Sequence, residues 1–228
     1  MLSDLKNDLG ELANTEKAKV LSGFFKTGKG QYAEGDKFIG VMVPFQRRIA
    51  KKYMDLPMFD LQELISSDIH EHRLTAVFIL IAKYEKTCDR SFVDFYLKNL
   101  KYINNWDLVD LSAPKILGHY LLEDKRDILY RLVKSKSLWE RRVAVLSTFA
   151  FIKKGDFGDA LNISELLLKD RHDLIHKAVG WMLREVGKRN QEVEEQFLNK
   201  YYKRMSRTML RYSIERFSSE KKQFYMKK

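Results

Sequence analysis

The chain is poor in the residues that build disulfides, sheets and membrane spans. Cys88 is the only cysteine in 228 residues, which excludes an intrachain disulfide and a thiolate-rich metal site and fits a reducing cytosol. The 3 prolines and 11 glycines are few for a sheet-rich protein, whose turns consume both. The longest apolar run, 74–82, is far shorter than the ~20 residues that span a bilayer. The charged N-terminus lacks the apolar stretch of a signal peptide, so we expect a cytoplasmic protein with no membrane partner.

Signatures of nucleophilic, nucleotide and metal chemistry are missing or incomplete. No Gly-x-Ser-x-Gly motif is present. Residues 23–30 resemble a P-loop, but Gly30 replaces the magnesium-binding hydroxyl and no strand precedes the segment. His172 and His176 have a metal-like i, i+4 spacing, yet no third ligand is evident among the five histidines. We therefore predict no metal and no cofactor, and a structural or DNA-facing role for these two histidines.

Positive charge is abundant and unevenly distributed. The net charge is +11 and the isoelectric point about 9.5, which indicates an anionic partner, either nucleic acid or a membrane surface. Residues 200–228 contain ten basic and two acidic side chains, a net +8. Because duplex DNA carries one charge per ~1.7 Å of its axis, a basic stripe is a suitable surface for it. For 218–228 itself we expect a solvated basic tail.

Apolar residues recur at helical spacing almost throughout, and strict alternation is absent, so the fold class is predicted to be all-α. A Gly-rich segment, residues 26–44, separates the N-terminal helices from the rest. Pro114 is expected in the first turn of its helix. The predicted helices are 2–25, 45–54, 59–66, 71–86, 89–99, 104–110, 112–121, 125–135, 139–153, 157–169, 173–188, 191–202 and 206–217.

The apolar runs repeat every 34 residues. One position of this register, which we call the repeat slot, falls on Ala76, Asp110, Ala144 and Ala178. Such a period predicts stacked helix pairs, here a HEAT-like solenoid with a concave face. We expect one domain over 1–228, with N-terminal helices and the Gly-rich segment in 1–44, repeats in 45–217 and the basic tail in 218–228. Basic residues precede the slots and would line the concave face; the candidates for DNA contacts are Arg141, Lys177, Arg184 and Arg211, with Arg73 and His176 at the same phase.

Asp110 stands out because the other three slots hold alanine. Trp106 is four residues earlier, on the same helical face, and Trp181 lies near the equivalent phase two repeats on. Indole faces attract cations and a carboxylate complements positive charge, so these residues match a cationic aromatic ligand. The alternative is ordinary packing of both tryptophans between repeats, with Asp110 capping the helix that contains Pro114. Spacing alone leaves both interpretations open.

At these positions the chain resembles the DNA alkylation repair family, the AlkD-type glycosylases with HEAT-like repeats. The resemblance covers most of the chain and rests on four segments, 35–41, 106–110, 139–144 and 177–185. It implies that Asp110 is the catalytic aspartate, that Trp106 and Trp181 are the aromatic pair, and that Arg142 is the active-site arginine. Arg142 lies two residues before its slot, about 160° away on an ideal helix, so its phase does not match that of Asp110.

The resemblance implies a hydrolase that excises N3- and N7-alkylated purines from duplex DNA, the first step of base excision repair. An alkylated purine is cationic and already a good leaving group, so Asp110 would stabilise the oxocarbenium-like sugar and position or deprotonate a water. Trp106 and Trp181 would contact the lesion, and Arg142 a nearby phosphate. Some relatives bind DNA without excising bases, so a non-catalytic HEAT-like DNA-binding module is the alternative. We expect a monomer, associated with the nucleoid.

Overall fold

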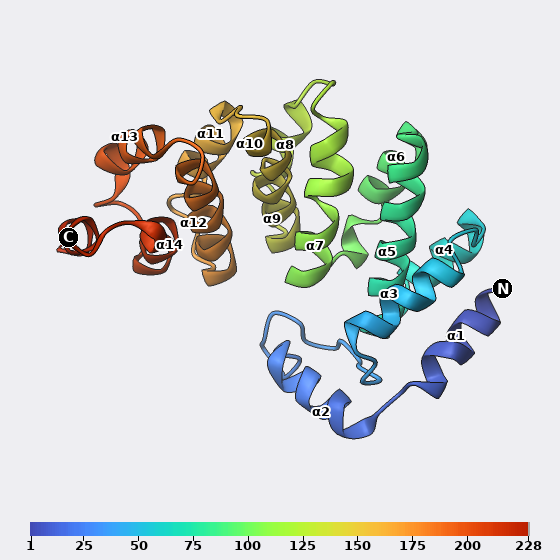
Figure 1. The fold of residues 1–228 in the computed structure, drawn as a ribbon. Coiled ribbons are helices and arrows are strands. Elements are labelled where there is room, and N and C mark those ends of the chain that lie inside the picture. The colour runs from blue at the N-terminus through green and yellow to red at the C-terminus, as the bar shows by residue number, and fades with distance from the viewer. Residues whose placement is uncertain (228) are drawn as a thin grey trace. The chain divides into compact units, whose positions relative to one another are not determined.

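The computed structural model describes residues 1–227, which form two compact units, Met1–Ser112 and the described residues from Ala113 onward. No β-strand occurs among the described residues, and an isolated bridge pairs Lys37 with Ile69. The all-α prediction is confirmed (Figure 1). The expectation of one domain stays a prediction, because a stack of repeats can be divided between neighbouring repeats without becoming two folds. No helix of the described part is long and apolar enough to cross a bilayer.

The first unit contains the N-terminal helices, the Gly-rich segment and the first repeats. Its long helix α5 packs against α3, α4, α6 and α7, and α1 packs against α3. From His70 to Ile81 every residue of α5 is buried, so this helix forms the centre of the unit. The elements are α1 (Leu2–Glu11), α2 (Thr15–Phe24), α3 (Val43–Lys52), α4 (Met58–Ile65), α5 (His70–Thr87), α6 (Arg90–Lys98), the 3-10 turn η1 (Leu100–Tyr102) and α7 (Trp106–Ser112).

The second unit is organised around α12, which packs against α9, α11, α13 and α14. Gly180 allows the close approach of α14, since a Cβ at this position would lie 2.5 Å from the Met209 carbonyl oxygen. The elements are the π-helical turn η2 (Pro114–Gly118), α8 (Asp127–Leu132), α9 (Leu138–Ser147), α10 (Phe149–Lys153), α11 (Gly158–Leu166), α12 (Asp173–Gly187), α13 (Gln191–Tyr201), α14 (Arg207–Ser213), the 3-10 turn η3 (Ile214–Arg216) and α15 (Ser219–Met226).

Side-chain caps explain where several helices begin. Asn14 Oδ1 accepts a hydrogen bond from the Lys17 amide at 2.9 Å, and this cap splits the predicted helix 2–25 into α1 and α2. Asp89, Ser137, Asn190, Ser206 and Ser218 cap α6, α9, α13, α14 and α15 in the same way. Pro114 lies in the first turn of η2, as expected.

The expectation of a solvated tail at 218–228 is wrong for the described residues of that segment. They form α15, which Ser218 caps. Tyr225 is buried, and its hydroxyl donates a hydrogen bond to Asn199 Oδ1 at 2.9 Å. Its ring packs against Phe217 and Tyr202. Tyr225 therefore anchors the segment, and Lys221 of the same helix is exposed.

Candidate active site

The repeat slot is a core position in three of its four copies. Ala76, Ala144 and Ala178 are fully buried, each 0% exposed. Asp110 in α7 is only half-buried, so the carboxylate occupies a partly accessible version of the same position. Burial raises the pKa of the nearby Tyr96 hydroxyl, and the Asp110 charge adds to that effect. Asp110 is thus an accessible carboxylate at the margin of a packed core.

Trp106 begins α7 one helical turn before Asp110, and it lies in an aromatic cluster. Its ring stacks on Phe25 at 5.2 Å between centroids and 19° between planes, and Phe24 approaches edge-on at 6.0 Å. Phe25 is buried, whereas Phe24 is 62% exposed. The C-terminal end of α2 therefore fixes Trp106 and presents a further aromatic ring to solvent beside it.

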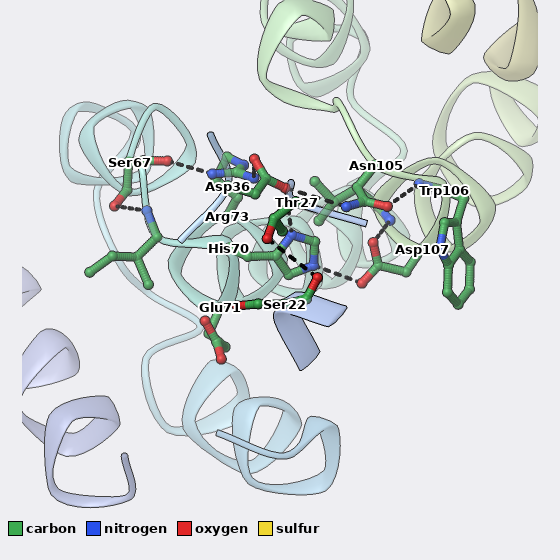
Figure 2. Close-up of polar contacts among 12 residues, drawn as sticks. Ser22, Thr27, Asp36, Ser67, His70, Glu71, Arg73, Asn105, Trp106 and Asp107 are labelled. Carbon is green, nitrogen blue, oxygen red and sulfur yellow. Dashed lines mark hydrogen bonds and ion pairs between the residues drawn. The ribbon is translucent and has the colours of Figure 1, made fainter. Parts of the chain in front are cut away.

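A buried polar network lies under the first turn of α7 (Figure 2). His70 Nε2 lies 2.8 Å from Asp107 Oδ2, and His70 Nδ1 lies 3.3 Å from Asp36 Oδ2. Asp36 also accepts hydrogen bonds from Arg73 at 2.7 Å and from Asn105 at 3.3 Å. Burial alone would lower the pKa of His70, but the Asp107 and Asp36 carboxylates outweigh it and raise the pKa. Burial likewise opposes ionisation of Asp36, yet hydrogen bonding to His70 and the charge of Arg73 lower its pKa.

In the second unit, Trp181 is half-buried on α12 and fixed by contacts at both ends of its indole. Its Nε1 donates to Glu185 Oε1 at 3.3 Å, and its ring lies 5.9 Å from that of Phe149. Glu185 is buried, and although burial opposes ionisation, hydrogen bonds from Lys188 and Arg189 lower its pKa. The indole of Trp181 therefore donates to a carboxylate that is paired with Lys188 and Arg189.

Arg142 is buried, with 5% of its surface exposed, and its Nη1 donates to the Leu174 carbonyl oxygen. The phase problem of this residue has a structural explanation. Every residue from Arg142 to Thr148 is buried, so this part of α9 and the residue after it are enclosed on all sides and have no solvent-facing side. A residue 160° from the slot is consequently as enclosed as the slot itself.

The basic residues before the slots serve the fold. Arg73, Arg141 and His176 each donate from a ring or guanidinium nitrogen to the backbone carbonyl six residues earlier, at 2.8, 2.9 and 2.6 Å. Arg73 and Arg141 also form ion pairs, with Asp36 at 2.7 Å and with Asp170 at 2.6 Å. These side chains therefore stabilise the loops that precede α5, α9 and α12. They are not the unpaired cations that a basic surface stripe would require.

The other predicted DNA-contacting residues differ in whether an acidic side chain already pairs with them. Lys177 pairs with Asp173 at 2.9 Å, and Arg184 pairs with Glu215. Arg211 is exposed on α14 and has no ion-pair partner among the described residues. Of the predicted contacts, Arg211 is the one whose charge is most available to a ligand.

The described residues hold no cluster of three or more histidine, cysteine or acidic side chains that could bind a metal. His172 caps α12 through Nδ1, which accepts from the Leu174 amide at 3.1 Å. Two backbone amides of the P-loop-like segment already have hydrogen-bond partners just after it. The amide of Gly28 donates to the Gln31 side chain, and the amide of Gly30 donates to the Glu34 side chain. Both motifs thus have structural explanations.

Sequence reasoning missed several residues of the α7 neighbourhood. Phe24 and Phe25 were placed at the end of the predicted helix 2–25 without a role in the site, although two adjacent aromatics at a helix end were a visible signal. Asp107 was passed over beside Asp110. Its partner His70 lies 37 residues earlier, and periodicity contains no information on such a pair.

An all-α repeat protein with a tryptophan and a carboxylate one turn apart is the class that the resemblance indicated. The family model described as DNA alkylation repair enzyme matches residues 5–217, so the chain belongs to that family. No curated protein sequence matches the chain.

Solved structures show the same fold. A predicted DNA alkylation repair enzyme from Enterococcus faecalis is 19% identical with a TM-score of 0.73, over 91% of this chain and 97% of that one. AlkD2 from Streptococcus mutans is 18% identical with a TM-score of 0.57, over 96% and 97% of the two chains. The protein smu.31 from Streptococcus mutans UA159 is 18% identical with a TM-score of 0.54, over 93% and 94%. The HEAT-like repeat class and the predicted family are therefore confirmed.

Proposed function

We propose that the protein is a DNA glycosylase that hydrolyses the N-glycosidic bond of cationic N3- or N7-alkylated purines in duplex DNA. The observation that carries the proposal is the half-buried Asp110, one turn from Trp106, in a chain of the DNA alkylation repair family. An acid at a position that the other repeats fill with buried alanine is unfavourable for packing and is explained by a ligand that carries positive charge.

In the proposed reaction the bond between C1′ and the purine nitrogen breaks, and the electron pair leaves with the purine. The cationic base thereby becomes neutral, so no general acid is required. Asp110 stabilises the positive charge that develops on the sugar, and a water oxygen then bonds to C1′ and releases one proton to Asp110 or to solvent. The products are the free alkylated base and an abasic nucleotide.

Trp106 would contact the deoxyribose and the cationic base through its ring, a contact worth ~0.5–2 kcal/mol. Stacking on Phe25 limits the motion of the indole and reduces the entropy lost on binding. In the second unit, we propose Trp181 as a further aromatic contact and Arg142 as a phosphate contact. Arg211 and Lys177 would contribute sequence-independent attraction to the backbone.

Release of 7-methylguanine or 3-methyladenine from methylated duplex DNA tests the proposal. Chromatography with mass detection measures the base above the spontaneous background. Asp110→Asn should lose roughly 100-fold or more of the rate, the scale expected when one charge-stabilising group is removed. Asp94→Asn, an exposed acid on α6, is the matched control and should retain full activity. Intact DNA after prolonged incubation with wild-type protein would refute the proposal.

A non-catalytic DNA-binding module is the second candidate, and the exposed Arg211, which has no ion-pair partner in the part of the chain that the structure describes, favours it. It predicts binding that weakens steeply with salt, survives Asp110→Asn and releases no base. The monomeric state and the cytoplasmic, nucleoid-associated location stay predictions from the sequence.

A further inference from the structure

His70 is held between two carboxylates that come from distant parts of the first unit. Asp36 belongs to the Gly-rich segment, and Asp107 belongs to the first turn of α7 (Figure 2). The imidazole is 1% exposed. Phe38 stacks on the ring at 4.6 Å and 21°, and Phe25 packs against it at 5.1 Å and 35°. These contacts fix both the plane of the ring and the direction of each ring nitrogen.

Only the doubly protonated ring satisfies this geometry. A neutral imidazole has one N–H, so one of its nitrogens would direct a lone pair at a carboxylate. The imidazolium donates to both. With His70 charged, the network contains two cations and two carboxylates, since Arg73 is the other cation and Asn105 is neutral. A balanced set of this kind is the arrangement in which buried charges are tolerated.

The two carboxylates depend on His70 to different degrees. Asp36 keeps two other donors, Arg73 and Asn105. Asp107 Oδ1 accepts from the Leu108 amide within its own helix, and its Oδ2 is held by His70. Deprotonation of His70 would therefore weaken the link from α5 to the first turn of α7, because Asp107 Oδ2 would lose its charged donor, while Asp36 stays anchored.

We propose that His70, in its imidazolium form, is a positioning residue that fixes α7 through Asp107 and so sets Trp106 and Asp110 against the DNA. This role rests on the proposed glycosylase function. Asp107 directly follows Trp106 and precedes Asp110 by three residues, so a movement of this turn displaces both. Misplacement of reacting groups by about 1 Å can lower a rate about 100-fold.

The charged groups around His70 define the direction of the pH dependence. They are Asp36 from the Gly-rich segment, Asp107 from α7 and Arg73 from α5; the nearby Glu71 instead accepts from the amides of residues 39–41. The two carboxylates raise the pKa of His70, so its imidazolium form is lost at a higher pH than that of an ordinary histidine. Base release should therefore decline on the alkaline side.

The test combines pH–rate profiles with nuclear magnetic resonance. Single-turnover base release is measured against pH for wild type, His70→Gln, Asp107→Asn and the control His119→Gln, an exposed histidine outside the network. His70→Gln should lower the rate about 10- to 100-fold, leave DNA affinity within about threefold and abolish the alkaline decline. His119→Gln should behave as wild type. In 15N-labelled protein, the His70 ring should be doubly protonated at pH 7.5 and should titrate lower in Asp107→Asn.

A neutral His70 at pH 7.5, or an alkaline decline unchanged in His70→Gln, would overturn the proposal while leaving the glycosylase function intact. If His70→Gln fails to fold, the pH–rate profile of Asp107→Asn and the titration of His70 in the wild-type protein still test the proposal. Absence of base release from wild type would remove both the proposed function and this role, so the two failures are distinguishable.

Discussion

Two glycines with similar positive φ angles make a quantitative test of the first unit. Gly35 and Gly40 have φ of +88° and +84°, a region that disfavours residues with a Cβ by about 1–2 kcal/mol. A Cβ on Gly35 would meet nothing within 4 Å. A Cβ on Gly40 would lie 2.0 Å from the Asn14 carbonyl oxygen and 2.8 Å from the Ala18 amide nitrogen. Both neighbours are backbone, so neither can move aside as a side chain could.

Gly35→Ala should therefore lose about 1–2 kcal/mol of unfolding free energy, from backbone conformation alone. Gly40→Ala carries the same cost plus about 1–3 kcal/mol for overpacking. It also separates the segment from α2, where the Asn14 amide donates to the Ile39 carbonyl oxygen at 2.8 Å. The Gly40 amide itself donates to the buried Glu71 at 2.8 Å, and displacement weakens that bond too.

Thermal unfolding followed by circular dichroism at 222 nm measures both variants against wild type. For a chain of this size 1 kcal/mol corresponds to about 2–4 °C in Tm, so Gly35→Ala should lower Tm by roughly 2–8 °C and Gly40→Ala by a clearly larger amount, roughly 4–20 °C. Equal decreases in Tm for the two variants would refute the reasoning, because they would mean that a side chain at position 40 does not clash with the backbone of α2. The pair matters for the site because the same segment contains Asp36.

Two further predictions concern charged residues of the second unit. Arg211→Ala should reduce the slope of log DNA affinity against log salt concentration by about 1. Arg141→Ala should leave that slope unchanged and lower the free energy of unfolding by about 3 kcal/mol, because it leaves the carboxylate of Asp170 without its ion-pair partner. A salt titration and urea unfolding measure the two effects, and a changed slope for Arg141→Ala with none for Arg211→Ala would contradict the prediction. Burial raises the pKa of Glu194 to about 8, so the stability contributed by its protonated form is complete below its unfolded pKa and is lost as pH rises towards 8. Glu194→Gln should thus raise Tm at pH 8.5 and leave it unchanged at pH 4, while the half-buried neighbour Glu195, paired with Lys221, should give no increase when changed to Gln.

Periodicity predicted the helices and the register of the repeats well. The reason is that three of the four slots are fully buried alanines, so the pattern in the sequence records the core directly. Boundaries were less accurate where a polar cap decided them, as at Asn14. The packed α15 was missed because its charge dominated the interpretation, although Phe217, Phe224 and Tyr225 were visible in the sequence.

The candidate site was predicted only in part, and the missing part is long-range. Asp36 and Asn105 are 69 residues apart, and His70 and Asp107 are 37 apart, so no helical period relates either pair. The interpretation of Arg73 as a surface cation had the same limit. Its partners are a carboxylate 37 residues away and a loop carbonyl, and neither can be inferred from a count of basic residues.

The departure of Asp110 from the alanine register has a structural counterpart in the N-terminal segment. The segment contacts α5, whose slot is Ala76, through the pairing of Asp36 with His70 and Arg73. It also reaches the start of α7: Phe25 stacks on Trp106, and Asp36 accepts from Asn105, the residue before that helix. An acid at the slot of α7 gives up the packing that a buried alanine provides, and these contacts at the first turn help to hold α7 in place. The N-terminal segment therefore links the Asp110 helix to the buried helix α5.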